Sequence, residues 1–499
     1  MNIRIKSFIL KHTWSIPVAT ALVLRLFMLT SSSIWHDEGY TMWLIRYNPL
    51  EIIARTARDV HPPGYYLIAK FWTALFGSSV FSIRFLSLIF SIGIVFITYK
   101  IVELIWNKKA AYWSSMIVSF SPFMIRFGQE ARMYGVIAFF TTLAAYYFIR
   151  YVKEKNFKYL YFFVPSMIVA MYTQYYSFFA IISFWIILAM LTPGFLTLNW
   201  KKSFKQVVGI FDYKWWLANI LLLILYIPWF YIAYKQVTRI SGDYWIKPEW
   251  INIATIPSNV LQLFTYSHLD FVYNELIFGD IIYWFITVIA IFSGLLLLLI
   301  KDKQKMSVLS LYVYGYMPMV FVLILSKLRT PIYQDRYFIF SSIAIFIIWG
   351  CLISEIGNKY IRIVTGSIFL GILLSGVVYM HIDVNHQMKQ VYDQVNAVKQ
   401  KSDIVLSSSL YTFLDGSYYF GYGNIRLIPD SVIGYGETSL FYDQVDKYVV
   451  NREVLDSLGN RIWVIGKPND EIIEETPLKD WQVNITIERK NIKAVLYTR

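Results

Sequence analysis

Long runs of apolar residues recur up to about residue 380, and they restrict the fold more than any other feature of the chain. Each run is roughly 17 to 25 residues long, the length of an α-helix that crosses a hydrocarbon layer about 30 Å thick. The composition agrees, because 57% of the 499 residues are hydrophobic and only 16% are charged, whereas soluble domains have about 25% charged residues. The sequence therefore predicts a polytopic α-helical membrane protein.

We expect about eleven transmembrane helices. The first apolar run follows Arg4, Lys6 and Lys11, as in a signal sequence, but Arg25 lies inside it, which favours an uncleaved anchor over a cleaved signal. The segment 65–77 is short and contains Lys70, so we predict a helix lying at the membrane interface. The expected spans are 14–30, 80–105, 110–127, 133–150, 158–173, 175–192, 214–234, 276–300, 306–327, 337–353 and 361–380.

The distribution of lysine favours one orientation in a plasma membrane. With the N-terminus inside and 65–77 lying flat, every lysine cluster between spans is cytoplasmic, as basic loops usually are. If 65–77 crossed the membrane, these clusters would all lie outside. The predicted outer segments are 31–79, 128–132, 235–275, 328–336 and the C-terminal part.

A soluble pattern begins near Asp383. Residues 403–408, 425–429 and 461–466 are predicted strands, a hairpin is expected from 481 to 498, and helices are expected around 410–420 and 439–457. We therefore divide the chain into a transmembrane domain, 1–382, whose outer loop 31–79 is catalytic, and an extracytoplasmic α/β domain, 383–499. The second domain has no evident catalytic cluster, so a lid or an acceptor-docking module is expected.

Charge and cysteine content exclude several classes of function. The net charge is +14, and the part from Asp383 onward carries −3, so the basic excess belongs to the membrane part, where anionic lipids and lipid phosphates lie. No nucleic-acid partner is needed to explain it. The single cysteine, Cys351, excludes an internal disulfide and a cysteine metal cluster.

Two adjacent carboxylates, Asp37 and Glu38, follow the first span. Adjacent side chains diverge in a helix or a strand, so we expect different roles for them. One could take the proton of an acceptor hydroxyl as a general base, and the other could orient it or bind a cation. A solvated pair without function is the alternative.

The rest of the first outer loop contains a predicted amphipathic helix over 50–60 that would lie on the lipid headgroups. His61 follows, held by Pro62 and Pro63, and is either a substrate contact or a hydrogen-bonded loop histidine. Arg84 lies in the second span and either binds an anion or snorkels to the headgroups. For Arg25, in the first span, snorkelling is favoured.

A second outer loop is unusually polar for a short connection between spans. It contains Gln129, Glu130, Arg132 and Tyr134, and a later outer loop adds Arg336. Arginine binds phosphate through two parallel hydrogen bonds, so these residues could clamp a lipid phosphate. A local ion pair of Glu130 is the alternative. The spacing His381-x-Asp383-x-x-His386 resembles a metal site but lacks a third strong ligand.

Together these motifs resemble the GT-C membrane glycosyltransferases, specifically the protein O-mannosyltransferase and aminoarabinose transferase branch. The resemblance rests on Asp37-Glu38, His61-Pro62-Pro63, Arg84 and residues 129–134, and it covers about the first 150 residues. Later spans match by topology only, and the β-trefoil insert of the eukaryotic mannosyltransferases is missing.

The resemblance implies an inverting transfer of a sugar from a polyprenyl-phosphate-linked donor to a lipid, glycan or protein acceptor on the outer face of the membrane. It implies Asp37 as the catalytic base, with Glu38 and His61 supporting it. Arg84, Arg132 and Arg336 are the implied donor-phosphate ligands, and Gln129, Glu130 and Tyr134 support them. A divalent metal is possible, because some relatives use one.

Two other functions remain open. An oligosaccharide ligase or polymerase would use a diphosphate-linked donor. A lipid or solute transporter would have related halves with interrupted helices, and the sequence has no such internal repeat.

Overall fold

The computed structural model describes residues 12–192, 211–240, 292–300, 304–383, 386–428, 440–468 and 477–499, with a few single positions between 246 and 288. These residues form two compact units. One contains Met1–Phe27 and Arg84–Ile382, and the other contains Met28–Ile83 and Asp383–Arg499. The segment Met28–Ile83 thus shares a unit with the C-terminal part of the chain.

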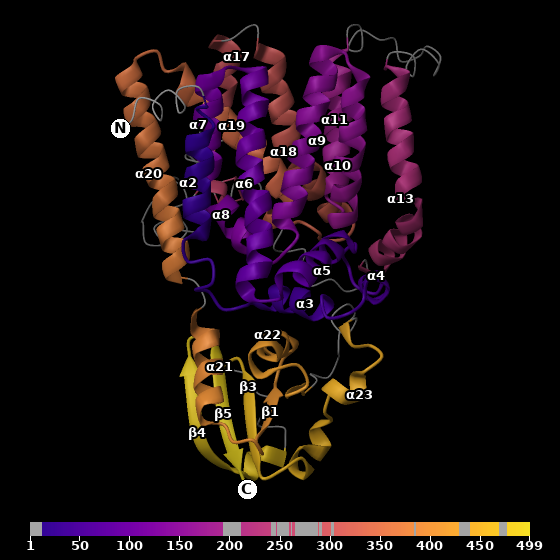
Figure 1. Ribbon diagram of the computed structural model, residues 1–499, viewed down its shortest axis with the longest axis vertical. Helices are drawn as coiled ribbons and strands as arrows, with labels where there is room; N and C mark the ends of the chain where they lie inside the picture. The colour runs from indigo at the N-terminus through magenta and orange to yellow at the C-terminus, as the bar shows by residue number, and fades with distance from the viewer. Residues whose placement is uncertain are drawn as a thin grey trace. The chain divides into compact units, whose positions relative to one another are not determined.

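The first unit is a bundle of helices that run side by side (Figure 1). Six of the expected spans form helices that are long and apolar enough to cross a membrane, and most of the span expected at 276–300 lies outside the described residues. The helices are α2 (Ser15–Leu26), α6 (Val80–Ile105), α7 (Lys108–Phe120), α8 (Pro122–Gln129), α9 (Tyr134–Glu154), α10 (Leu160–Thr173), α11 (Ser177–Leu191), α13 (Tyr213–Ile240), α17 (Leu296–Ile300), α18 (Lys305–Leu328), α19 (Ile339–Glu355) and α20 (Lys359–Asp383).

The expected single span 110–127 is wrong, because the chain breaks into α7 and α8 at Ser121. Pro122 has no N–H and disfavours a helical conformation at the residue before it. Ser121 accordingly has an extended ψ of 120°, and its side chain accepts from the N–H of Met124. The break leaves the last carbonyls of α7 available to other donors.

α19 is the central helix of the bundle and packs against α7, α9 and α18. Gly350 permits its close approach to α7, because a Cβ atom there would lie 2.4 Å from the backbone nitrogen of Ser114. A cavity of about 210 Å³ is lined by Ile105, Lys153 and Met306, so the ends of α6 and α9 and the start of α18 meet at one end of the bundle.

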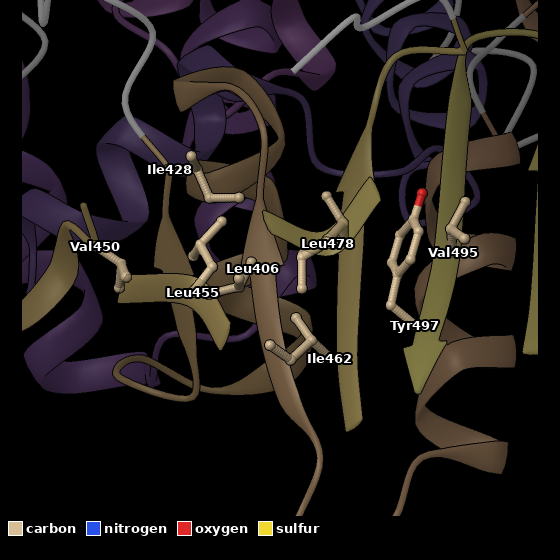
Figure 2. Packing of buried hydrophobic residues seen from close by; sticks show 9 residues of the cluster. Leu406, Ile428, Val450, Leu455, Ile462, Leu478, Val495 and Tyr497 are labelled. Atoms are coloured by element: carbon tan, nitrogen blue, oxygen red, sulfur yellow. The ribbon is translucent and has the colours of Figure 1, made fainter. Parts of the chain in front are cut away.

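The second unit contains a five-stranded sheet of order β2-β1-β3-β5-β4. β1 pairs in parallel with β2 and β3, and the other pairs are antiparallel. All five predicted strands are confirmed as β1 (Ile404–Ser407), β2 (Ile425–Leu427), β3 (Arg461–Gly466), β4 (Gln482–Arg489) and β5 (Ile492–Thr498). One face of the sheet covers an apolar core (Figure 2), whose labelled members include Leu406, Ile462 and Tyr497.

Helices flank this sheet. α21 (His386–Val398) packs on β4 and β5, and α22 (Leu410–Phe420), predicted from the sequence, packs on β1 and β2. The helix expected over 439–457 is wrong, because only α23 (Val445–Tyr448) and a 3₁₀ turn at Arg452–Ser457 form there. The same unit holds α3 (His36–Leu44), α4 (Pro49–Ala57) and α5 (Gly64–Phe76) from the first outer loop.

Candidate active site

Asp37 and Glu38 lie in the first turn of α3. Trp35 is extended and precedes the helix, so both carboxylates lie at a helix N-terminus, where the helix dipole stabilises negative charge. The Asp37 side chain is 18% exposed, whereas Glu38 is only 1% exposed. The two side chains thus differ in burial, with Asp37 partly exposed and Glu38 enclosed.

His36 lies beside the Asp37 carboxylate, with its Nε2 atom 3.5 Å from Asp37 Oδ1. Its ring packs edge-on against Trp35, at 4.8 Å between centroids, and against Tyr411 of α22, at 4.5 Å. These aromatic contacts fix the imidazole beside Asp37.

α3 packs closely against α22, the helix that lies on β1 and β2 of the C-terminal sheet. A Cβ atom on Gly39 would lie 2.9 Å from the carbonyl carbon of Leu414, so only glycine fits at this crossing. Trp43 packs on Phe413 with ring centroids 5.7 Å apart. The C-terminal sheet therefore supports the helix that carries both predicted acids.

This crossing brings a third acid, Asp415, to the pair. Asp415 is 1% exposed. Burial raises the pKa of its carboxyl group well above the usual range, and the charges of Glu38 and Asp37 raise it further. The sequence analysis missed this residue, and the signal that could have found it is a lone acid among Phe413, Leu414 and Phe420.

α4 confirms the helix predicted over 50–60. Its residue Leu50 is 78% exposed, while Arg55 is 1% exposed. Arg55 donates from Nη1 and Nη2 to the two carboxylate oxygens of Asp443, each at 2.9 Å, and its Cζ atom lies 3.7 Å from the centroid of the Tyr47 ring. The buried face of α4 is thus built around an ion pair with the C-terminal part of the chain.

His61 lies in the turn between α4 and α5, where it is half-buried. Pro62 and Pro63, which follow it, are buried, and α5 begins at Gly64. The two prolines fix the backbone at this turn. The expected short helix at 65–77 is confirmed as α5.

In the helix bundle, the predicted phosphate ligands Arg84 and Arg132 are 2% and 3% exposed. A Cβ atom on Gly135 would lie 3.1 Å from the backbone oxygen of Ser87, so α6 and α9 touch at this point. Arg84 precedes Ser87 by about one helical turn of α6, and Arg132 lies just before the start of α9. Arg84 and Arg132 therefore lie at the same end of the bundle.

The segment before α19 reaches this end as well. The rings of Tyr337 and Tyr134 are 6.4 Å apart between centroids, and the Tyr176 ring is 4.8 Å from Tyr337. Arg336 directly precedes Tyr337 and is half-buried. The structure thus brings Tyr134 and Arg336 close to one another from distant parts of the sequence.

Two of the predicted supporting residues, Gln129 and Glu130, make polar contacts within the bundle. Gln129 Nε2 donates to the backbone oxygens of Arg25 (3.0 Å) and Phe27 (2.8 Å), which caps the end of α2. Glu130 accepts from Arg126, the local ion pair considered above.

The expectation that Arg25 snorkels is wrong, because this residue is fully buried. Its guanidinium group donates to Ser91 Oγ at 2.6 Å and to the carbonyl oxygens of Ser119 and Val118, each at 3.1 Å. Those carbonyls lie in the last turn of α7, which ends at Phe120. The break before Pro122 therefore supplies the acceptors that hold Arg25 inside the bundle.

No group of three or more histidine, cysteine, aspartate or glutamate side chains within the described parts of the chain could hold a metal ion. The side chains of Asp383 and His386 from the metal-like spacing lie outside the described residues. Asp37, Glu38 and Asp415 approach one another without forming such a group.

A family model described as dolichyl-phosphate-mannose-protein mannosyltransferase matches residues 60–232. This range contains His61, Arg84, Arg132 and Tyr134, whereas Asp37 precedes it. No curated protein matches the chain by sequence.

Solved structures share the fold over nearly the whole chain. ArnT from Cupriavidus metallidurans matches in the apo state with a TM-score of 0.61 and 11% identity, covering 97% of each chain. The same protein bound to undecaprenyl phosphate matches with a TM-score of 0.59 and 10% identity, covering 97% of this chain and 98% of that one. An oligosaccharyltransferase from Archaeoglobus fulgidus, in complex with Zn and sulfate, matches with a TM-score of 0.53 and 11% identity, covering 97% and 72%.

Proposed function

We propose that this chain is a membrane glycosyltransferase of the GT-C superfamily and that it transfers a sugar with inversion from a polyprenyl-phosphate-linked donor to an acceptor on the outer face of the membrane. The observation that carries the proposal is the difference between the two acids of α3. The Asp37 side chain is 18% exposed, while Glu38 is 1% exposed.

An open carboxylate suits the chemistry of an acceptor hydroxyl, which is a poor nucleophile at neutral pH. In the proposed step, Asp37 takes the hydroxyl proton while the acceptor oxygen forms a bond to the anomeric carbon. The bond between that carbon and the phosphate oxygen breaks, and the lipid phosphate leaves with the bonding electron pair. General-base catalysis of this kind contributes about 10²–10⁴-fold to the rate.

The leaving lipid phosphate needs positive charge around it. Arg84 and Arg132 are the proposed ligands, because both are buried at one end of an apolar bundle and a guanidinium group matches phosphate geometry. Arg336 is proposed as a third. Charge on the phosphate grows as the glycosidic bond breaks, so these arginines would stabilise the transition state more than the bound donor.

Relatives support a lipid-linked donor. ArnT has been solved with undecaprenyl phosphate, and the matching family model is named for dolichyl-phosphate mannose. Membrane spans of the expected length would keep such a lipid tail within the bilayer.

The test uses the purified full chain in lipid nanodiscs with polyprenyl-monophosphate sugars labelled in the sugar. We expect release of the free lipid phosphate together with a labelled product whose anomeric configuration is opposite to that of the donor. A panel of acceptors, comprising lipid, glycan and peptide, identifies the acceptor class.

The same assay in nanodiscs, together with an assay of the chain in sealed vesicles, separates the alternatives. Release of lipid diphosphate from a diphosphate-linked donor, with none from monophosphate donors, would indicate the ligase or polymerase. Movement of intact donor across a vesicle membrane without cleavage would indicate the transporter.

A further inference from the structure

Asp415 differs from the other buried polar groups of α22 in its hydrogen bonding. Thr412 Oγ1 makes hydrogen bonds with the hydroxyls of Ser407 and Ser409, and the Ser417 hydroxyl donates to Phe413 O. Asp415 Oδ1 is buried and has no hydrogen-bond partner. An ionised carboxylate without a partner is costly to bury, so this environment favours the neutral acid.

The crossing of α3 and α22 sets what this group faces. The backbones meet at Gly39 and Leu414. Glu38 directly precedes Gly39, and Asp415 directly follows Leu414, so the two acids flank the same contact. The charges that act on the Asp415 carboxyl group are those of Glu38 and Asp37.

The other elements packed on α22 bring few titratable groups to this point. α21 contributes Tyr392, which is fully buried and interacts electrostatically with Asp415. β1 has no titratable residue, and Arg426 of β2 is exposed. His36 of α3 packs against Tyr411, one turn before Asp415.

We propose that Asp415 is a positioning residue for the transfer reaction, which holds the Asp37–Glu38 pair in place from the C-terminal domain. The proposal rests on the function proposed above for Asp37. A neutral carboxyl group has one O–H donor, and the acids of α3 are acceptors when ionised, so a charge-assisted hydrogen bond can form between them. Loss of the proton would leave three like charges at one helix crossing.

Two variants separate this role from a purely structural one. Asp415→Asn keeps the size and a hydrogen-bond donor but cannot ionise. Asp415→Leu removes both the hydrogen-bond donor and the ionisable group. Asp393→Asn is the matched control, because Asp393 is an exposed acid on the adjacent helix α21.

We expect Asp415→Leu to lower kcat at least about tenfold with donor KM within about twofold, because the group positions the base without touching the donor. Asp415→Asn should lose less than Asp415→Leu. The wild-type rate should fall on the alkaline side as Asp415 ionises, and this decline should be absent in Asp415→Asn and present in Asp393→Asn.

A second measurement needs no donor. Because the pKa of Asp415 is raised in the folded state, its stabilising contribution is complete below the unfolded carboxyl pKa of about 3.9 and is lost as pH rises through the folded value. The melting temperature of Asp415→Asn relative to wild type should therefore rise with pH. If Asp415→Leu fails to fold, Asp415→Asn still carries both tests.

The outcomes keep the two proposals apart. Identical pH profiles of rate and of melting temperature for wild type and Asp415→Asn would overturn this inference and leave Asp37 as the base. Absence of sugar transfer from every donor, with the expected melting behaviour, would overturn the proposed function and show that Asp415 couples to the α3 acids without serving that reaction.

Discussion

The two compact units hold their buried arginines in different ways. In the helix bundle, Arg25 donates to one serine hydroxyl and two backbone carbonyls, none of which is charged. In the other unit, Arg55 donates to both oxygens of the Asp443 carboxylate. The charge of Arg25 thus persists inside an apolar bundle, whereas that of Arg55 is neutralised.

This difference indicates what each unit can do. Positive charge that is held by neutral groups in an apolar region attracts anions. A neutralised pair contributes fixed geometry instead, and Arg55 connects α4 to the segment around Asp443 in the unit that carries Asp37. In the function proposed above, the bundle binds the lipid phosphate and the other unit holds the catalytic carboxylate.

Asp37→Asn should have the largest effect, because it removes the open carboxylate while keeping its shape. We expect kcat for sugar transfer to fall about 10²–10⁴-fold. Donor KM and the melting temperature should change little, since asparagine has the shape of the aspartate that it replaces. Normal transfer by Asp37→Asn combined with inactive, folded Glu38→Gln would place the base at the enclosed acid.

Arg84→Lys and Arg132→Lys test the bundle. Lysine keeps the charge but lacks the planar fork that binds phosphate, so we expect donor KM to rise about tenfold, equivalent to about 1.4 kcal/mol. Acceptor KM should be unaffected. Arg150→Lys is the control, because Arg150 pairs with Glu154 at the opposite end of α9. Wild-type donor KM in both bundle variants would leave these arginines as structural groups only.

The apolar runs and strand patterns predicted most of the fold, because hydrophobic length and short buried strands are local signals. The break at Ser121 was missed although Pro122 marks it. The sequence alone indicated Asp37 and Arg84 as candidate site residues. Charged side chains beside or within apolar spans are energetically costly, so they are rare there and indicate a functional site.

The contacts between distant segments were not predictable in this way. Arg55 and Asp443 are 388 positions apart. α3 meets α22 at Gly39, and no local turn or helix cap at Gly39 indicates in the sequence why a glycine is needed there. A single sequence predicts the helix that carries Arg55 but not the partner of its guanidinium group. Asp415 was missed for the same reason.

Asp443→Asn should have a smaller effect, on stability. It removes one partner of a buried guanidinium group, and we expect a loss of about 1–2 kcal/mol, limited because the Asp443 side chain is 41% exposed. The hydrogen bonds from Arg55 lower the pKa of Asp443. Its contribution is therefore complete above the unfolded carboxyl pKa of about 3.9 and is lost as pH falls through the folded value.

Thermal unfolding in detergent from neutral to acidic pH measures this contribution. The gap between wild type and Asp443→Asn should be widest at neutral pH and close under acid conditions. A gap that is independent of pH would show that the asparagine disturbs packing rather than the ion pair.

Asp393→Asn should have the smallest effect. Asp393 and Lys389 also form an ion pair in this unit, but their charged atoms are 3.8 Å apart and their side chains are 59% and 50% exposed. Water and salt screen such a pair, so we expect a loss below about 0.5 kcal/mol that vanishes at high salt. If Asp393→Asn destabilised the protein as much as Asp443→Asn, burial of the arginine would not be what gives the Arg55 pair its strength. The difference between Arg25, which is held by neutral groups, and Arg55, which is neutralised by Asp443, would then depend on the number of ion pairs in each unit. It would not depend on how deeply each pair is buried.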